Sequence, residues 1–144
     1  MTNQPLTILL AEDEENDAFF LKQALEAVSA PNTVHHVRDG QQALDFLKQQ
    51  GAYESAPRPD IILLDINMPK KSGYDVLLEI KADDSLKAIP VIVISGSNDV
   101  DDVYKSYNHY AAAYITKSKS LESMNNLVSA VDSFWFRHVT LPRI

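Results

Sequence analysis

Two stretches of the chain consist of aliphatic residues with no polar interruption, and both end on a polar side chain. Residues 61–64 read Ile-Ile-Leu-Leu and stop at Asp65, whereas residues 91–94 read Val-Ile-Val-Ile and stop at Ser95. A short uninterrupted run rich in branched side chains is typical of a strand buried on both faces. We therefore predict two central strands of a sheet at these positions.

Around these runs, apolar residues recur at the three- and four-residue spacing of amphipathic helices, as at Leu21, Leu25 and Val28. Three further stretches have the length and composition of strands. The predicted strands are residues 6–11, 33–38, 61–64, 91–94 and 110–116. The predicted helices are residues 14–29, 41–50, 72–81, 99–108 and 121–138.

Polar residues and glycine mark the ends of the first two helices. Asp13 is expected to cap the first helix through its side-chain oxygen. Three acids lie in the first turn, where negative charge favours the helix dipole: Glu14, Glu15 and Asp17. Gly51 is expected to end the second helix, because glycine accepts the left-handed backbone that often follows a helix.

Strands and helices alternate five times along the chain. This alternation predicts a doubly wound α/β fold, with a parallel sheet that carries helices on both faces. Right-handed crossovers restrict the topology, and the flavodoxin-like strand order 2-1-3-4-5 suits five strand–helix units. A length of 144 residues suits one domain. We expect residues 1–144 to form that single domain, with no output domain attached.

The net charge and the residue composition of the chain limit the kinds of partner that it can bind. The formal net charge of −7 argues against binding to nucleic acid, which requires a basic surface. The chain has no cysteine, so thiol chemistry and disulfides are excluded. It has neither a signal-peptide pattern at its start nor an apolar stretch near the roughly 20 residues that span a bilayer. We therefore expect a soluble cytoplasmic protein without membrane contact.

Polar residues with potential chemistry stand at four strand ends. They are Glu12 and Asp13 after the first strand, Asp65 after the third, Ser95 at the fourth and Lys117 after the fifth. In the expected strand order these four strands are neighbours, so the side chains should converge at one edge of the sheet. Each residue alone could be a solvated acid, a turn serine or a surface lysine. Their joint placement favours a functional site.

Three carboxylates in one place require compensating positive charge, or one of them takes up a proton. Mg²⁺ binds carboxylate oxygens and usually retains several waters, and Lys117 adds a fixed cation. Acids, metal, hydroxyl and lysine together suit phosphoryl transfer, in which catalysis rests on positioning and charge neutralisation. In this interpretation Asp65 is the nucleophile and forms an aspartyl phosphate.

From about residue 6 to residue 138, the chain resembles the receiver domain of two-component response regulators. The residues that carry the resemblance are Glu12 and Asp13, then Asp65 with Asn67, Met68, Pro69 and Gly73, then Ser95, and finally Tyr114 and Lys117. Any one of these motifs alone is a weak signal. The resemblance rests on their combination and order along the chain.

The resemblance implies a role for each site residue. Asp65 would accept the phosphoryl group from the phosphohistidine of a sensor histidine kinase. The resemblance assigns Mg²⁺ to Asp13, Asp65 and the backbone carbonyl of Asn67, with Glu12 reaching the metal through water. Such a protein catalyses only its own phosphorylation and dephosphorylation, and so is not an enzyme with a separate substrate.

The resemblance also implies a conformational switch. Ser95 and Tyr114 would form the switch pair, in which the hydroxyl turns towards the phosphoryl group and the ring moves inward. This movement would reshape the face formed by residues 99–108, 110–116 and 121–138.

One position departs from the family pattern. Ser118 follows Lys117 where the family usually has proline, often after a cis peptide bond. Because a cis bond before a residue other than proline costs about 3 kcal/mol, we expect either a trans bond or a strained loop here.

Several features resemble a narrower group, the stand-alone regulators that pair with cyanobacterial and bacterial phytochromes. They are the Lys117-Ser118 pair, the loop at residues 53–59, and the aromatic residues 134–136 followed by Leu141-Pro142. Those regulators form homodimers through the face described above. A helix cannot bury three consecutive aromatics on one side, so at least one should be exposed or docked on a partner. Two alternatives are open for this helix end: it folds onto the chain's own tail, or it contacts a second copy or another partner.

Three other functions remain as alternatives. An aspartate-dependent phosphatase of the haloacid-dehalogenase type would need a general acid two residues after Asp65, but Asn67 occupies that position. A receiver that acts only as a phosphate-independent binding module typically lacks the acceptor or the acids, all of which are present. A flavin-binding relative of this fold would need a glycine-rich phosphate loop, and the chain has only 4 glycines.

Overall fold

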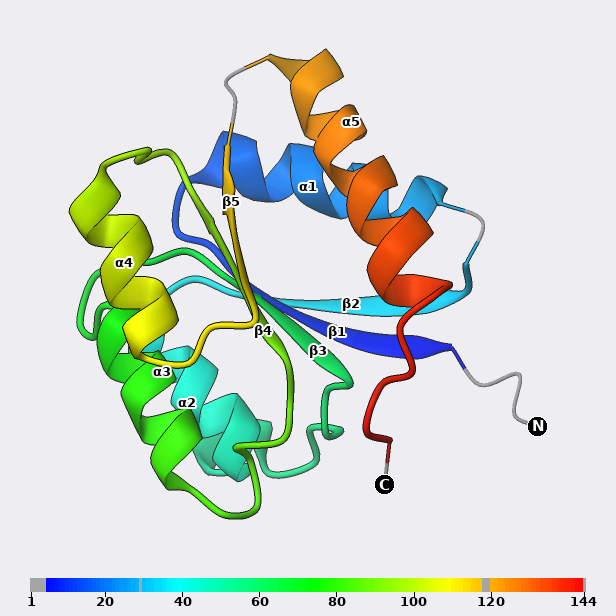
Figure 1. The fold of residues 1–144 in the computed structure, drawn as a ribbon. Helices are drawn as coiled ribbons and strands as arrows, with labels where there is room; N and C mark the ends of the chain where they lie inside the picture. Colours follow the sequence, from blue (N-terminus) through cyan, green and yellow to red (C-terminus); the bar gives the residue numbers. More distant parts are fainter. Residues whose placement is uncertain (1–4, 29, 118–119, 144) are drawn as a thin grey trace.

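The computed structural model describes residues 5–28, 30–117 and 120–143, and shows a sheet between two layers of helices (Figure 1). The strands are β1 (Leu6–Ala11), β2 (Asn32–Val37), β3 (Ile61–Leu64), β4 (Val91–Ser95) and β5 (Ala113–Thr116). The helices are α1 (Glu15–Ala27), α2 (Gly40–Lys48), α3 (Gly73–Ala82), α4 (Val100–Asn108) and α5 (Leu121–Val131), with a 3-10 turn η1 (Gly51–Tyr53) and a π-helical turn η2 (Asp132–Phe136).

The five strands are parallel and lie in the order β2-β1-β3-β4-β5, which confirms the predicted fold class and topology. The register aligns the carboxyl ends of the central strands, because Ala11 of β1 pairs with both Val37 of β2 and Leu64 of β3. A backbone hydrogen bond extends this alignment beyond the strands, since Asp65 N donates to Ala11 O at 3.0 Å. The polar residues that follow β1 and β3 therefore lie side by side.

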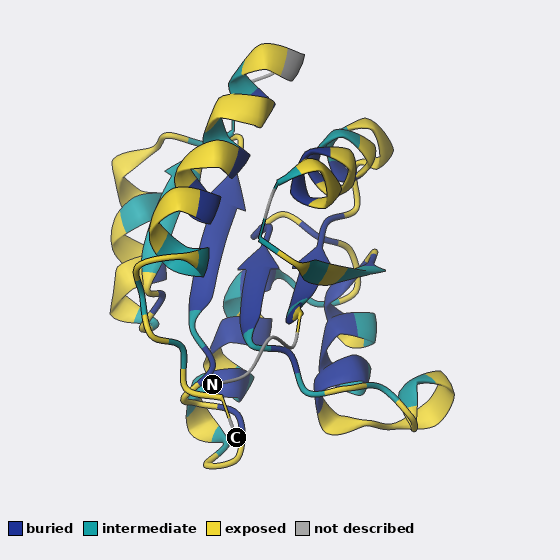
Figure 2. Ribbon diagram, turned by 90° about the vertical axis from the view of Figure 1, so that its right-hand side faces the viewer, coloured by how far each residue is buried: buried dark blue, intermediate teal, exposed yellow. Residues whose placement is uncertain are grey.

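The central strands of the sheet are buried on both faces, as the uninterrupted aliphatic runs predict. Every residue of β3 and β4 is buried, and Figure 2 shows the strands enclosed by helices whose outer surfaces are exposed. One core cluster joins the sheet to α2 and α3, and the other joins it to α1 and α5. Within the described residues, no helix is long and apolar enough to cross a membrane.

Two helix ends differ from the prediction. Glu14, rather than Asp13, caps α1, and its carboxylate accepts hydrogen bonds from the backbone N–H groups of Asn16 and Asp17. Asp13 is instead left outside the helix, among the acids of the sheet edge. Gln49 takes the left-handed conformation after α2 with φ 56°, so the helix ends two residues before Gly51, the residue expected to end it. Ser72 caps α3 and Asp99 caps α4, each by accepting a backbone N–H on its side-chain oxygen.

The aromatic segment after α5 is a π-helical turn rather than the regular helix predicted as far as residue 138. Phe134 is exposed, whereas Trp135 and Phe136 pack against the cluster between the sheet, α1 and α5. Leu141 of the returning tail packs against the same cluster. The prediction that at least one of the three aromatics is exposed is confirmed, and the other two fold onto the chain's own core.

The tail ends beside the first strand. Arg143 donates to Pro5 O at 3.1 Å and to Asp60 Oδ1 at 3.2 Å. The other carboxylate oxygen of Asp60 accepts from Thr7 N at 2.8 Å. Asp60 therefore ties the tail and β1 together at the amino edge of the sheet, opposite the edge that carries the polar residues.

Candidate functional site

A cavity of about 320 Å³ opens at the carboxyl edge of the sheet. It is lined by Asp13, Glu14, Asp17, Asp65, Asn67, Gly96 and Lys117. These residues come from the loops that follow β1, β3, β4 and β5 and from the first turn of α1. The cavity therefore lies where ligand sites of open α/β sheets are found.

Three acids meet at this edge of the sheet, and two of them, Asp13 and Asp65, line the cavity. Carboxylate oxygens of Glu12, Asp13 and Asp65 all lie within 4.8 Å of one another. Glu12 is 1% exposed and Asp65 is also buried, whereas Asp13 is exposed. Asp65 Oδ1 accepts a hydrogen bond from Asn67 N at 3.2 Å, which orients the carboxylate. The structure thus brings together the acids that the sequence predicts to converge.

Lys117 lies against these acids with only 8% of its side chain exposed. Its Nζ is 2.6 Å from Glu12 Oε1, 2.9 Å from Asp17 Oδ2 and 3.6 Å from Asp65 Oδ2. A backbone hydrogen bond from Lys117 N to Ser95 O at 2.6 Å holds the end of β5 beside the end of β4. A single ammonium therefore faces three carboxylates, two of them at hydrogen-bond distance.

Burial and neighbouring charges change the pKa values of Glu12 and Lys117. Burial raises the pKa of Glu12 to about 8; the hydrogen bond from Lys117 opposes this rise and the charge of Asp65 adds to it. Burial alone would lower the pKa of Lys117, but the carboxylates of Glu12, Asp17 and Asp65 outweigh it and hold that pKa above its usual range. The site therefore holds more negative charge than its one lysine compensates.

This charge excess and donor set fit a divalent cation. Three carboxylates offer the hard oxygen ligands that such ions prefer, and one of them, Asp13, is open to the solvent. A bound dication would offset the mutual repulsion that favours protonation of Glu12. Glu12, Asp13 and Asp65 therefore form a candidate site for a divalent metal.

The loop after β3 holds Asp65 against the start of α3. Gly73 N donates to Ile66 O at 2.9 Å. A Cβ atom at Gly73 would stand 2.4 Å from Asp65 O and 2.5 Å from Ile66 Cα, so only glycine fits here. Lys70 completes the turn with φ 67°, in the left-handed region. The loop thereby fixes the backbone of Asp65 by direct contact.

Ser95 and Tyr114 lie beside the cavity rather than in its lining, and Ser97 connects them. Ser95 is fully buried, and its Oγ accepts from Ser97 N at 3.2 Å. Tyr114 is half-buried, and its hydroxyl donates to Ser97 O at 2.6 Å. A displacement of the loop between β4 and α4 would therefore disturb the hydrogen bonds of both Ser95 and Tyr114.

The same loop is tied to two helices. Asp102 of α4 accepts from Ser97 Oγ at 2.6 Å and from the Tyr74 hydroxyl of α3 at 2.7 Å. These hydrogen bonds hold the pKa of Asp102 below its usual range. The described chain therefore contains a continuous polar connection from Ser95 to the surface of α4.

Asp17 is the site residue that the sequence prediction missed. Its place in the first turn of α1 explains it as a helix-dipole acid, yet its side chain turns to Lys117. Ser118, the position that departs from the family pattern, lies outside the described residues.

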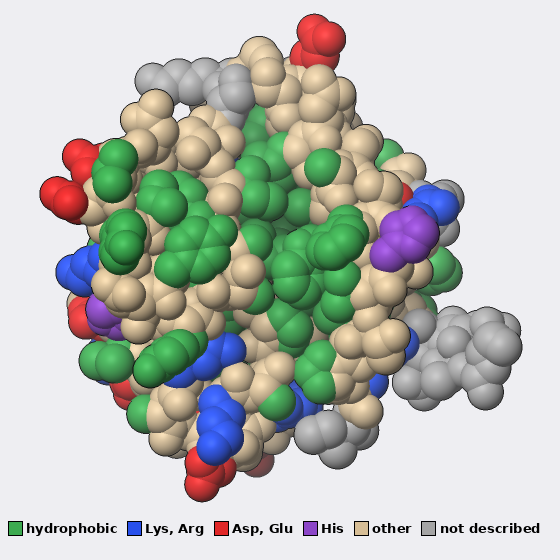
Figure 3. Space-filling view, in the orientation of Figure 1, with side chains coloured by type: hydrophobic (Ala, Val, Ile, Leu, Met, Phe, Trp, Pro, Cys, Tyr) green, Lys and Arg blue, Asp and Glu red, His purple; other side chains and the backbone are tan. Residues whose placement is uncertain are grey.

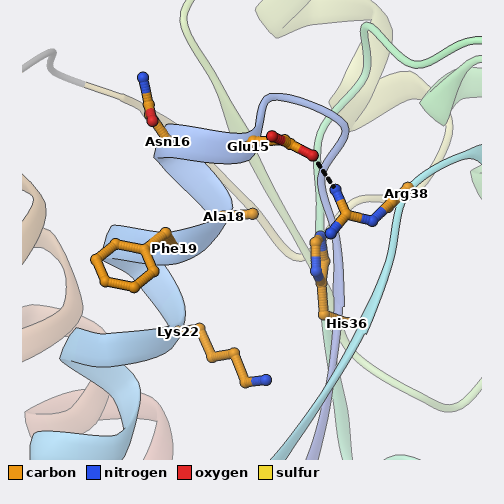
Figure 4. A pocket seen from close by; sticks show the side chains of 7 residues that line it. All are labelled: Glu15, Asn16, Ala18, Phe19, Lys22, His36 and Arg38. Atoms are coloured by element: carbon orange, nitrogen blue, oxygen red, sulfur yellow. Dashed lines mark hydrogen bonds and ion pairs between the residues drawn. The ribbon is translucent and has the colours of Figure 1, made fainter.

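A second hollow lies on the far side of α1, between that helix and the end of β2 (Figure 4). Glu15 and Arg38 form an ion pair across it at 3.1 Å. His36 turns into this hollow and bonds to Glu12 O at 2.8 Å, whereas His35 stacks on Phe46 with ring centres 5.3 Å apart. The two histidines therefore face opposite sides of the sheet and share no metal site.

Known proteins are similar to this chain in sequence and in fold. A family model described as the response regulator receiver domain matches residues 8–131. Response regulator Rcp1 of Synechocystis sp. is 44% identical over 141 residues, which cover 98% of this chain and 96% of that protein.

Two solved structures are similar over nearly their full length. The phosphorylated cyanobacterial phytochrome response regulator RcpA superposes with a TM-score of 0.93 at 44% identity, over 97% of this chain and 100% of that chain. The Mn²⁺-bound form of response regulator Rcp1 superposes with a TM-score of 0.91 at 44% identity, over 96% of this chain and 100% of that chain. One relative is therefore known in a phosphorylated form and the other with a divalent metal.

Proposed function

The chain belongs to the family of response regulator receiver domains, and on this basis we propose that it signals by accepting a phosphoryl group on Asp65. One observation carries the proposal. Asp65 lies with two further acids and a buried lysine at one edge of the sheet, with Lys117 Nζ 3.6 Å from Asp65 Oδ2. Receiver domains are phosphoacceptors rather than enzymes with a separate substrate, and we assign the same role to this protein.

In the proposed transfer, a carboxylate oxygen of Asp65 attacks the phosphorus of a phosphohistidine on a histidine kinase. The new P–O bond forms as the P–N bond breaks, and the imidazole leaves with the electron pair. Lys117 donates to one phosphoryl oxygen and the Ser95 hydroxyl to another, which neutralises charge on the transferring group. The signal ends when water attacks the phosphorus and releases inorganic phosphate and the Asp65 carboxylate.

The metal in this proposal is Mg²⁺. Asp13, Asp65 and the backbone carbonyl of Asn67 would hold it, with Glu12 reaching it through water. When bound, it supplies positive charge that offsets the charge of the phosphoryl oxygens. The observed cluster of carboxylate oxygens and the Mn²⁺-bound relative support a divalent site of this kind.

Intact-mass measurement after incubation with phosphoramidate and Mg²⁺ tests the proposed function. We expect one phosphate adduct per chain, which is lost in base, as an acyl phosphate should be, and which does not form after chelation of the metal. An unchanged mass under all donor and metal conditions would show that the protein is not a phosphoacceptor.

Metal affinity should depend on pH through Glu12. Its pKa is raised from 4.5 to about 8, so the folded protein retains a proton that the unfolded chain has lost between these values. The free energy of unfolding without metal should therefore fall as pH rises through this range. Because Mg²⁺ competes with that proton, the Mg²⁺-induced rise in Tm should be larger at about pH 9 than at about pH 6.

Glu12→Gln is the control for this pH dependence, because the amide keeps the shape and does not titrate. Its Mg²⁺-induced rise in Tm should be smaller than in the wild type and nearly independent of pH. A wild-type metal effect of equal size at both pH values would refute the assignment of the titrating proton to Glu12.

We propose that the phosphoryl donor is a sensor histidine kinase of the phytochrome type. Receiver domains imply a cognate histidine kinase. The narrower assignment is supported by the similarity over almost the whole chain to RcpA, which is described as a cyanobacterial phytochrome response regulator. A purified phytochrome kinase that phosphorylates this chain faster than an unrelated histidine kinase does would support it.

The output of the switch is assigned to the α4-β5-α5 face. Hydrophobic side chains cover α4 and continue across the middle of the same side of the molecule (Figure 3). Val100, Tyr104, Tyr107 and Tyr110 are among the exposed large hydrophobic residues. Exposed apolar patches of this kind commonly mark interaction surfaces. We propose that this face forms a homodimer and changes when Asp65 is phosphorylated.

Tyr104 is the most direct probe of the dimer. Its side chain is 68% exposed, so Tyr104→Glu should leave the fold intact while it places a charge in the interface. We expect the wild type to sediment as a dimer and the variant to shift to a monomer. Leu78→Glu on α3, which replaces an equally prominent exposed residue elsewhere, should remain dimeric. A wild-type monomer with and without phosphoryl donor would eliminate the dimer.

A further inference from the structure

Asp17 lines the cavity and contacts Lys117, but the proposed chemistry gives it no role. Its Oδ2 is 2.9 Å from Lys117 Nζ, closer than the 3.6 Å that separates this ammonium from Asp65 Oδ2. The oxygens that cluster as candidate metal ligands belong to Glu12, Asp13 and Asp65, so Asp17 is outside that group. Asp17 therefore competes for the lysine without being assigned to the metal.

The competition is strong because Lys117 is buried. Only 8% of its side chain is exposed, so water replaces few of its contacts and ionic hydrogen bonds dominate. Hydrogen bonds between two charged groups are roughly twice as strong as neutral ones. The ammonium has three N–H donors, and Glu12 and Asp17 accept two of them, so these two carboxylates set its position and leave its Nζ 3.6 Å from Asp65 Oδ2.

We propose that Asp17 is a positioning residue that holds Lys117 on the α1 side of the cavity and so limits the rate of phosphorylation at Asp65. The inference rests on the proposed phosphoacceptor function. Its chemical consequence is specific: loss of the Asp17 charge frees the lysine for the phosphoryl group. The protein should then react faster, whereas loss of a purely structural contact would leave the rate unchanged or lower it.

The test compares two acids in the same first turn of α1. Asp17→Asn keeps an acceptor oxygen but removes the charge beside Lys117. Glu15→Gln removes the same charge from the same helix end, but Glu15 pairs with Arg38 instead (Figure 4). With phosphoramidate and Mg²⁺, intact-mass time courses should show at least a threefold higher rate for Asp17→Asn and a near wild-type rate for Glu15→Gln.

Two further variants separate lysine positioning from other effects. Asp17→Glu retains a carboxylate and should restore a rate near that of the wild type. In a Lys117→Gln background, where adduct is followed over hours, adding Asp17→Asn should no longer change the rate. An equal acceleration in that background would mean that Asp17 acts by repelling the donor, and would overturn the inference.

The outcomes separate the inference from the proposed function. If the wild type forms no adduct, the phosphoacceptor proposal fails. If the wild type forms the adduct but Asp17→Asn reacts no faster than Glu15→Gln, only the role of Asp17 is refuted. Thermal melting of each variant without metal shows whether it folds, independently of the phosphorylation rate.

Discussion

Asp65→Asn is expected to form no phosphate adduct, whereas the wild type forms one. The amide oxygen is too weak a nucleophile to attack phosphorus, so the loss should be complete within the detection limit of intact-mass measurement. The replacement keeps the shape of the side chain and an oxygen that can accept the hydrogen bond from Asn67 N. It also removes one negative charge from the acidic cluster, so the Tm without metal should stay the same or rise.

Asp132→Asn is the matched control for this variant. Asp132 is about as buried as Asp65 but lies after α5, where it pairs with Arg137. The Asp132→Asn variant should therefore be phosphorylated at the wild-type rate, even if its stability changes. If Asp65→Asn took up phosphate as the wild type does, the acceptor would have to be another residue, and the role assigned to Asp65 would be wrong.

Gly73→Ala should destabilise the protein by about 3 kcal/mol, at the upper end of what overpacking typically costs. The added Cβ would meet Asp65 O at 2.4 Å and Ile66 Cα at 2.5 Å, and these backbone atoms cannot turn aside as a side chain would. To relieve this steric overlap, either α3 or the loop that carries Asp65 must move. We expect Tm to fall by roughly 10 °C and the phosphorylation rate to fall with it, because the acceptor's backbone shifts.

Gly96→Ala provides the comparison for the glycine prediction. Gly96 lines the cavity, but a Cβ built there meets nothing within 4 Å. It should retain a Tm close to that of the wild type. Thermal melting of the two variants side by side measures the difference, and equal stability of both would contradict the close contact at Gly73.

The central part of the fold could be predicted because local pattern and burial agree there. β3 and β4 are short aliphatic runs, and a sheet covered by helices on both faces is the environment in which such runs are stable. The convergence of Glu12, Asp65 and Lys117 followed from topology alone, since the carboxyl ends of parallel neighbours share one edge. No side-chain detail was needed for these predictions.

Other features depend on contacts that no local pattern encodes. Glu14 instead of Asp13 caps α1, because either acid can reach a free N–H group and the neighbouring acids decide between them. The π-helical turn after α5 contains neither proline nor glycine, and its two packed aromatics meet the core only in the folded chain. In α4, Val100, Tyr104 and Tyr107 have the spacing of an apolar helix face, but this spacing does not indicate that all three side chains are exposed.

Asp17 shows the same limit within the site. A first-turn acid has a sufficient local explanation in the helix dipole, so the sequence gives no reason to look for another. Its pairing with Lys117, 100 residues away along the chain, arises only when β5 is laid beside β4 and α1 covers the edge.

The contact between Arg143 and Pro5 has a practical consequence for the connectivity of the chain. Since these residues are hydrogen-bonded at the amino edge of the sheet, the two segments could be joined by a short peptide without stretching the fold. New termini could then be opened in the exposed segment around η1, away from the acidic cavity. A circular permutant of this design would keep every strand neighbour while changing which elements are synthesised first.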